Sequence, residues 1–184
     1  MQQSIVKTIK NKIFKYPRGK LFFPINFRKT GNEEAVKKAL FRLERAGFLI
    51  RLAHGIYLFP KKDKEMGTLY PSVESIALAI AKRDKARILP TGIQAMNMLG
   101  LSTQIPLNIV YLTDSSPRSI KLGRRKITFK KAGPKSFLAK GKISSMAIQA
   151  LKSIGKKNVT SEDIEKIRKA LKKEQVKNII HDSK

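Results

Sequence analysis

Residues 32–59 decide the fold, and they read NEEAVKKALFRLERAGFLIRLAHGIYLF. The first half of this stretch predicts a helix, because Asn32 is a good N-cap residue and Glu33 and Glu34 suit the positive end of the helix dipole. Gly47 then stands where the C′ glycine of a helix is expected. The helix is therefore expected to begin after Asn32 and to end just before Gly47.

The second half of the stretch predicts a β-hairpin. Residues 48–52 and 56–59 are rich in β-prone apolar side chains, and Pro60 ends the second run. Between these runs, Ala53-His54-Gly55 can form a three-residue loop in which the glycine takes a positive φ. A helix followed directly by a hairpin is thus expected between residues 32 and 59.

Upstream of this stretch the sequence predicts two more helices. Residues 4–16 carry isoleucines at i, i+4 and i+8 with lysines between them, which is the period of an amphipathic helix. Pro24 can open a brief helix that ends at Phe27, since proline is tolerated in the first helical turn. The order helix, short helix, helix, hairpin is the layout of a winged helix-turn-helix, so residues 1–62 are expected to form such a DNA-binding domain.

The rest of the chain predicts a second domain, of mixed α/β type, over residues 68–184. Residues 61–67 are polar and end in glycine, which indicates a linker. Helices are expected near residues 72–83, 91–99, 144–154 and 163–171, the last open to continuation as far as Ile180, and strands near residues 87–89, 107–113, 119–122 and 126–129. The predicted fold class is therefore α+β, a winged helix-turn-helix followed by a mixed α/β domain with C-terminal helices from about residue 144.

The composition favours a polyanionic partner and excludes several chemistries. Among 184 residues, 40 Lys and Arg stand against 13 Asp and Glu, a formal net charge of +27. A field of that sign attracts nucleic acid first, then an anionic membrane, then an acidic protein. With no cysteine and 2 histidines, the chain lacks the residues of thiolate zinc sites, iron–sulfur clusters and disulfides, so we expect neither a metal nor another cofactor.

The sequence also indicates where the protein works. No stretch reaches the roughly 18 uninterrupted apolar residues that a bilayer span requires. The N-terminus lacks the apolar core of a signal peptide, and the absence of cysteine suits a reducing compartment. We therefore expect a cytoplasmic protein with no membrane partner.

One face of the predicted helix after Asn32 is a candidate for reading DNA. On a wheel of about 100° per residue, an apolar stripe and a basic face fall on opposite sides. The stripe consists of Val36, Ala39, Leu40 and Leu43, and the opposite face of Lys38, Phe41, Arg42 and Arg45. The second helix of a helix-turn-helix lies in the major groove, where arginine bonds guanine bidentately and an apolar ring contacts a thymine methyl. The alternative is a solvated basic face, with the phenyl ring packed beneath the wing or against a neighbouring molecule.

The tip of the predicted hairpin adds two candidates. Arg51 and His54 lie beside the tight glycine turn, where a wing can follow the minor groove and the phosphate backbone. Each also has a simpler interpretation, Arg51 as an outward strand residue and His54 as a turn residue with no catalytic or metal role. Together with the helical face, they form the candidate DNA-binding set.

A second basic group surrounds the hairpin expected near residues 119–129. It comprises Arg118, Lys121, Arg124, Arg125 and Lys126. As an auxiliary basic surface it can bind phosphate or dock an acidic protein, since complementary charge speeds encounter and selects the partner. The alternative is again a solvated face.

The sequence offers no catalytic residues. The four acids of residues 65–134 show neither an acid-x-Lys triplet nor the clustered carboxylates of metal-assisted hydrolysis. Phosphate-binding glycine loops, the Gly-x-Ser-x-Gly elbow and the His-Glu-x-x-His helix are also absent. We therefore expect a protein that is not an enzyme. A basic RNA-binding protein is the first alternative to a DNA-binding regulator, and a nuclease is the second.

Six segments of the chain resemble one family. Residues 16–22, 34–43 and 50–57 resemble the winged-helix domain of AbiEi-type antitoxins, and residues 91–101, 108–114 and 123–127 resemble the domain that follows it. The likeness covers residues 1–135. It implies an autorepressor that binds double-stranded operator DNA and, as the antitoxin of a type IV toxin–antitoxin pair, counters a nucleotidyltransferase-like toxin encoded beside it. In that family the two proteins are described as acting without a stable complex.

The resemblance also implies roles for particular residues. It marks Arg42, Arg45, Arg51 and His54 as DNA-facing positions. These are the positions that the helical wheel and the hairpin turn indicate independently. Residues 136–184 resemble no family specifically.

Overall fold

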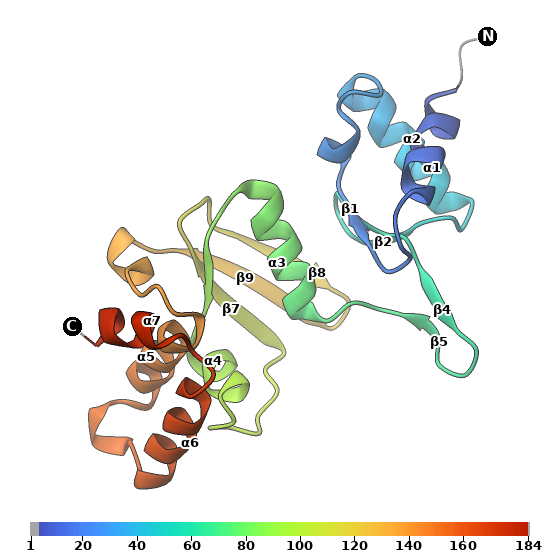
Figure 1. Ribbon diagram of the computed structural model, residues 1–184. Coiled ribbons are helices and arrows are strands. Elements are labelled where there is room, and N and C mark those ends of the chain that lie inside the picture. The colour runs from blue at the N-terminus through green and yellow to red at the C-terminus, as the bar shows by residue number, and fades with distance from the viewer. Residues whose placement is uncertain (1–3, 184) are drawn as a thin grey trace. The chain divides into compact units, whose positions relative to one another are not determined.

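The computed structural model describes residues 4–183. These residues divide into two compact units, with the division between Ala79 and Ile80 (Figure 1). Both helices and strands occur in each unit. The fold class is α+β, as the sequence predicts.

The first unit follows the expected order of helix, short helix, helix and hairpin. Its elements are α1 (Ile5–Phe14), β1 (Leu21–Phe22), the 3-10 helix η1 (Pro24–Phe27), α2 (Glu33–Arg45), β2 (Ile50–Ala53) and β3 (Ile56–Leu58). The three strands form an antiparallel sheet in the order β1-β3-β2. Strand β1 is absent from the sequence-based prediction because two residues carry too little pattern to indicate a strand.

The ends of α2 lie where local signals place them. The Asn32 side chain accepts a hydrogen bond of 2.8 Å from the Ala35 N–H, so it is the N-cap. At the other end Gly47 has a φ of +69°, and the Phe48 N–H donates to the Leu43 carbonyl at 2.9 Å. These bonds satisfy groups that the helix ends leave unpaired.

The hairpin after α2 differs from the prediction in its turn. Ala53 pairs with Ile56, so the loop has two residues, His54 and Gly55, rather than three. A register shift between Arg51 and Ala53 leaves Leu52 as the extra residue of a β-bulge. The third residue that the sequence pattern assigns to the loop, Ala53, is therefore the last residue of β2.

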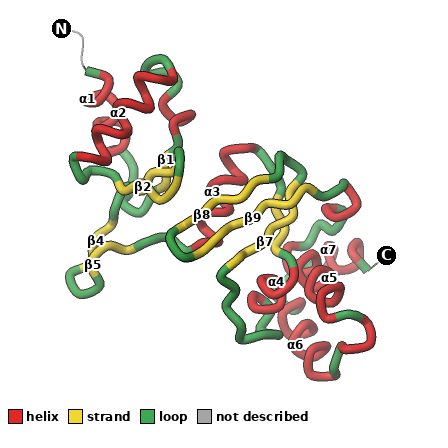
Figure 2. The backbone as a smooth tube through the Cα atoms, turned by 180° about the vertical axis from the view of Figure 1, so that it is seen from behind, coloured by secondary structure: helices red, strands yellow, loops and turns green. Residues whose placement is uncertain are grey.

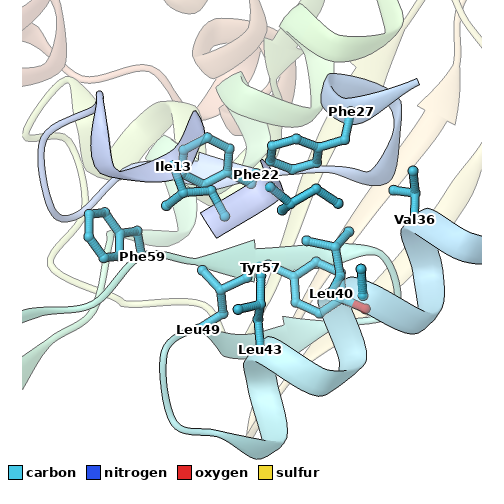
Figure 3. Close-up of a cluster of buried hydrophobic side chains, with 11 residues drawn as sticks. Ile13, Phe22, Phe27, Val36, Leu40, Leu43, Leu49, Tyr57 and Phe59 are labelled. Atoms are coloured by element: carbon cyan, nitrogen blue, oxygen red, sulfur yellow. The ribbon is translucent and has the colours of Figure 1, made fainter. Parts of the chain in front are cut away.

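The core of the first unit lies between α1, α2 and the small sheet (Figure 3). The apolar stripe of α2 is buried, as predicted. It lies in the same core as the rings of Phe22, Phe27 and Tyr57 (Figure 3). The buried members of this core are Ile9, Ile13, Phe22, Phe27, Val36, Ala39, Leu40, Leu43, Leu49, Tyr57 and Phe59. The burial of these side chains fixes which side of α2 faces solvent.

The segment predicted as a linker is a second hairpin. Strands β4 (Lys61–Asp63) and β5 (Gly67–Leu69) pair antiparallel. The Asp63 carboxylate closes the turn by accepting the N–H groups of Glu65 and Met66 at 2.9 and 3.0 Å. The sequence analysis predicts a linker here but not this pairing, in which an Asx turn and a positive φ at Gly67 form a hairpin from polar residues. Helix α3 (Val73–Asp84) follows and runs across the division between the units.

The second unit is built on a four-stranded mixed sheet with the strand order β6-β7-β9-β8. Strands β7 and β9 are parallel, and the other two pairs are antiparallel. The elements after α3 are β6 (Ile88–Pro90), α4 (Gly92–Met98), β7 (Asn108–Thr113), β8 (Arg118–Leu122), β9 (Arg125–Lys131), η2 (Pro134–Phe137), α5 (Lys142–Ile154), η3 (Lys156–Asn158), α6 (Ser161–Leu171) and α7 (Val176–Asp182). The expected helices and strands of this part are all present.

The C-terminal helices pack on α4 and are tied to the start of α5. Helices α4, α5 and α6 share an apolar cluster. The last predicted helix does not run on to Ile180, because α6 ends at Leu171 and the chain turns before α7. In that turn the Glu174 carboxylate accepts the Ile143 N–H at 2.8 Å, a contact between residues distant in the sequence.

Asp182 completes the N-terminal cap of α5 from the far end of the chain. Its carboxylate accepts the N–H groups of Lys140 and Gly141 at 2.9 and 2.8 Å, and its side chain is buried. Burial opposes the negative charge, but hydrogen bonds from Lys140, His181 and Gly141 outweigh it and hold the pKa of Asp182 at about 2. The native fold therefore favours the ionised carboxylate.

We expect Asp182→Ala to lower the free energy of unfolding of the second unit by about 1–3 kcal/mol at neutral pH, because the N–H groups of Lys140 and Gly141 lose their charged acceptor. Since the pKa of Asp182 is lower in the folded state, this stabilisation is present above about pH 4 and is lost as the pH falls toward 2. Chemical unfolding at several pH values measures both effects. Glu165→Ala removes an exposed acid from α6 and is the control; an equal loss in both variants would contradict a specific cap.

Candidate nucleic-acid interface

Helix α2 presents a basic face to solvent. Phe41 is 51% exposed, while the adjacent Leu40 is 0% exposed and lies in the core. Arg42 and Arg45 are exposed on the same side, as predicted. The helical period places the two arginines and the phenyl ring within about 100° of one another. The sequence-predicted face therefore exists as a continuous surface of one rigid helix.

The first turn of α2 carries its own counter-charges. Glu33 lies 2.5 Å from Lys37, and Glu34 lies 2.7 Å from Lys38, both pairs at i,i+4 spacing. Such exposed pairs contribute little to stability, but they occupy the lysine ammonium groups. Of the four predicted positions on this face, Lys38 is therefore already paired, and the positive charge is concentrated toward the C-terminal end of the helix.

The two hairpin candidates are in direct contact with each other. The Arg51 guanidinium lies 3.1 Å from Nδ1 of His54, and both side chains are exposed. Arginine has donors only, so Nδ1 of the imidazole accepts this hydrogen bond. Arg51 pairs across the strands with Tyr57, which belongs to the core. The contact with His54 and the strand pairing give Arg51 a defined direction at the tip of the hairpin.

Tyr57 and Glu44 lie near Arg51, and the sequence does not single them out. Burial is the main cause that raises the pKa of the Tyr57 hydroxyl; the nearby Arg51 lowers it and Glu44 raises it. Tyr57 therefore stays neutral at physiological pH. The apolar run of residues 56–59 indicates a strand, but only the sheet register shows that Tyr57 pairs with Arg51.

The turn before α2 supplies two further cations that the sequence analysis did not select. Arg28 and Lys29 are exposed between η1 and α2. The turn is fixed by a hydrogen bond of 2.7 Å from the Lys12 ammonium to the Thr30 hydroxyl. Their place in the turn that leads into α2 is the signal that could have identified them.

A hollow of about 570 Å³ beside the C-terminal end of α2 is also basic, but two of the three cations that line it, Lys10 and Arg18, have other contacts. Lys10 lies 5.2 Å from the centre of the Phe48 ring. Arg18 lies 4.8 Å from the centre of the Phe59 ring and donates to the Pro60 carbonyl at 3.1 Å. These cation–π contacts support the core of the first unit, so we do not include the hollow in the candidate interface.

The second predicted basic group does not form a single surface. Arg118 pairs with Phe129 on one face of the sheet, is half-buried there and forms an ion pair with Asp84. Lys121 and Lys126 lie opposite each other on the other face. Arg124 is in the turn and Arg125 faces the same side as Arg118. The prediction of one auxiliary surface from these five residues was wrong, because successive residues of a strand alternate between the faces.

The two acids beside the sheet of the second unit are engaged by arginines. Asp84 contacts Arg83 at 2.7 Å as well as Arg118, and Asp114 contacts Arg87 at 2.8 Å. Hydrogen bonds from the side chain and the N–H of Arg87 lower the pKa of Asp114. Within residues 4–183, no three His, Cys, Asp or Glu side chains are grouped to hold a metal ion. In the same residues no helix is both long enough and apolar enough to cross a bilayer.

Comparison with known families places almost the whole chain in one of them. Residues 8–179 match the model of DUF6088, a family of unknown function, and the chain belongs to this family. No curated protein is significantly similar to it. The match extends over parts of both compact units.

Proposed function

We propose that the first unit is a winged helix-turn-helix that binds double-stranded DNA in a sequence-specific manner, with α2 in the major groove and the β2–β3 hairpin as the wing. The observation that carries the proposal is the exposed face of α2, where Phe41, Arg42 and Arg45 project from a helix whose opposite side is locked in the core. Fixed arginines on a groove-sized helix suit bidentate contacts to guanine.

The hairpin and the preceding turn support the same orientation. Arg51 and His54 lie at the tip of the hairpin, where a wing reaches the neighbouring groove or backbone. Arg28 and Lys29 lie at the turn into α2, where phosphate contacts position a recognition helix. In this arrangement base contacts come from α2 and phosphate contacts come from both sides of it.

We further propose that the protein is a transcriptional autorepressor and the antitoxin of a type IV toxin–antitoxin pair. This part of the proposal rests on the resemblance of residues 1–135 to AbiEi-type antitoxins. The first unit would repress the operon, and the second unit would counter a nucleotidyltransferase-like toxin. The proposal requires no metal or other cofactor and no catalytic residue.

The test is a binding titration with duplex DNA from the protein's own promoter and with an unrelated duplex, over about 50–200 mM salt. Non-specific phosphate binding falls steeply across this range, whereas base contacts persist. We expect the promoter duplex to remain bound at the upper end after the unrelated duplex has dissociated. Loss of both duplexes together would contradict sequence-specific recognition, and a preference for RNA would favour the alternative of an RNA-binding protein.

A further inference from the structure

The sheet of the second unit has one face that carries a row of lysines. Alternate residues of a strand share a face, and so do residues that pair across strands. Lys126 and Lys130 therefore share a face of β9, and Lys121 of β8 lies opposite Lys126. A contact of 3.2 Å between the hydroxyls of Ser119 and Thr128 shows that side chains of both strands meet on this face. We call Lys121, Lys126 and Lys130 the lysine row.

The lysine row has no acidic neighbour on its face. All three lysines are exposed, and the positions around them on β8 and β9 hold only hydroxyl side chains. Like charges directly opposite in an antiparallel pair destabilise a sheet, and Lys121 and Lys126 form such a pair. The two acids beside the sheet, Asp84 and Asp114, are held by arginines. An anionic ligand is what would neutralise this face.

The adjacent strand adds a second, uncharged row. Asn108, Val110 and Leu112 of β7 stand in register with Lys126, Thr128 and Lys130 of β9 and share their face. Asn108 is exposed, and the two aliphatic side chains are half-buried. Along β7 the side chains of this face follow one another at about 7 Å, which is two residues of a strand, whereas Lys126 and Lys130 of β9 are four residues apart, about 13 Å, with Thr128 between them. The face therefore combines a row of positive charge with a parallel row of amide and apolar groups.

This face is accessible in the second unit. In Figure 2, no helix lies in front of β8 and β9. The aromatic rings of β7 and β9 belong to the opposite face, where Tyr111 and Phe129 are buried and stack with their centres 6.0 Å apart. Contacts to the open face are therefore made by charge, hydrogen bonds and aliphatic groups rather than by stacking on aromatic rings.

We propose that this face binds a single strand of nucleic acid, with the phosphates along the lysine row and the bases over Asn108, Val110 and Leu112. A single strand presents phosphates on one side and unpaired bases on the other, which matches a charged row beside an uncharged one. A duplex encloses its bases in the stack and offers this face only phosphates. The site lies in the second unit, so it does not depend on the proposed recognition by α2.

The experiment compares two triple variants of the full chain that lose equal charge. Lys121→Gln, Lys126→Gln and Lys130→Gln remove the lysine row. Lys156→Gln, Lys157→Gln and Lys172→Gln remove three exposed lysines from the C-terminal part as the control. The probes are a fluorescein-labelled oligodeoxythymidine of about 20 nucleotides and a duplex of the same length, titrated by anisotropy at several salt concentrations.

We expect the lysine-row variant to bind the single strand about 100-fold more weakly at about 0.1 M salt. Its plot of log affinity against log salt should be flatter by about 2, because each lost phosphate contact removes about 0.7 from the slope. The control variant and the duplex should change much less. The unfolding midpoint of the lysine-row variant should equal or exceed that of the wild type, since the repulsion between Lys121 and Lys126 is gone.

Three results would overturn the proposal. An equal loss in the control variant would mean that total charge alone determines binding. An equal loss for the duplex would mean that the face contacts phosphates without regard to unpaired bases. No loss for either probe in a folded lysine-row variant would leave an acidic protein as the partner that fits this charge.

Discussion

Replacing Arg42 or Arg45 with alanine should weaken binding to the promoter duplex by about 1–3 kcal/mol each, or roughly 5- to 150-fold. Both side chains are exposed on α2. They lie C-terminal to the two ion pairs that Glu33 and Glu34 form with Lys37 and Lys38. A bidentate contact to guanine is lost outright when the guanidinium is removed. The two residues are three apart on one helix, so the effect of the double variant need not equal the sum of the single effects.

The measurement is a titration of each variant with the promoter duplex and the unrelated duplex at a fixed salt concentration. Lys172→Ala removes one exposed positive charge from the second unit and is the matched control. A contact to a base weakens binding to the promoter duplex more than to the unrelated one, whereas a contact to a phosphate weakens both. If neither arginine variant loses promoter affinity, α2 does not present this face to DNA.

The parts of the fold that the sequence predicts are those with strong local signals. Asn32 and Gly47 set the ends of α2 through hydrogen bonds and a backbone angle that depend only on neighbouring residues. Strand β1 and the β4–β5 hairpin were not predicted, because they are recognised by their pairing partners rather than by their own residues. The break at residues 172–175 likewise involves a long-range bond, from the Ile143 N–H to Glu174.

The same distinction applies to the candidate sites. The basic face of α2 could be predicted because the helical period fixes which side chains share a face. The pairing of Lys38 with Glu34 is also a local, i,i+4 effect, so the sequence contains it. The division of the second basic group between two sheet faces required the register of β8 on β9. That register separates Arg118, which contacts Asp84, from Lys121 on the open face.

Leu40→Ala and Phe41→Ala should separate folding from recognition, because one of these adjacent residues of α2 lies in the core and the other is exposed to solvent. Leu40 is 0% exposed in the core and Phe41 is 51% exposed. Removing a fully buried leucine side chain costs about 2–5 kcal/mol, since apolar contacts are lost and a cavity remains. Removing the half-exposed Phe41 ring should change the free energy of unfolding much less, by about 0.5 kcal/mol.

Amide hydrogen exchange in α2 and β3 reports the stability of the first unit separately from that of the second. Leu40→Ala should speed exchange throughout these elements by a factor that corresponds to its loss of stability. Phe41→Ala should leave exchange unchanged and still weaken binding to the promoter duplex, because its ring is placed to contact a thymine methyl. Faster exchange in Phe41→Ala would instead assign the ring a structural role, and unchanged affinity would remove it from the interface.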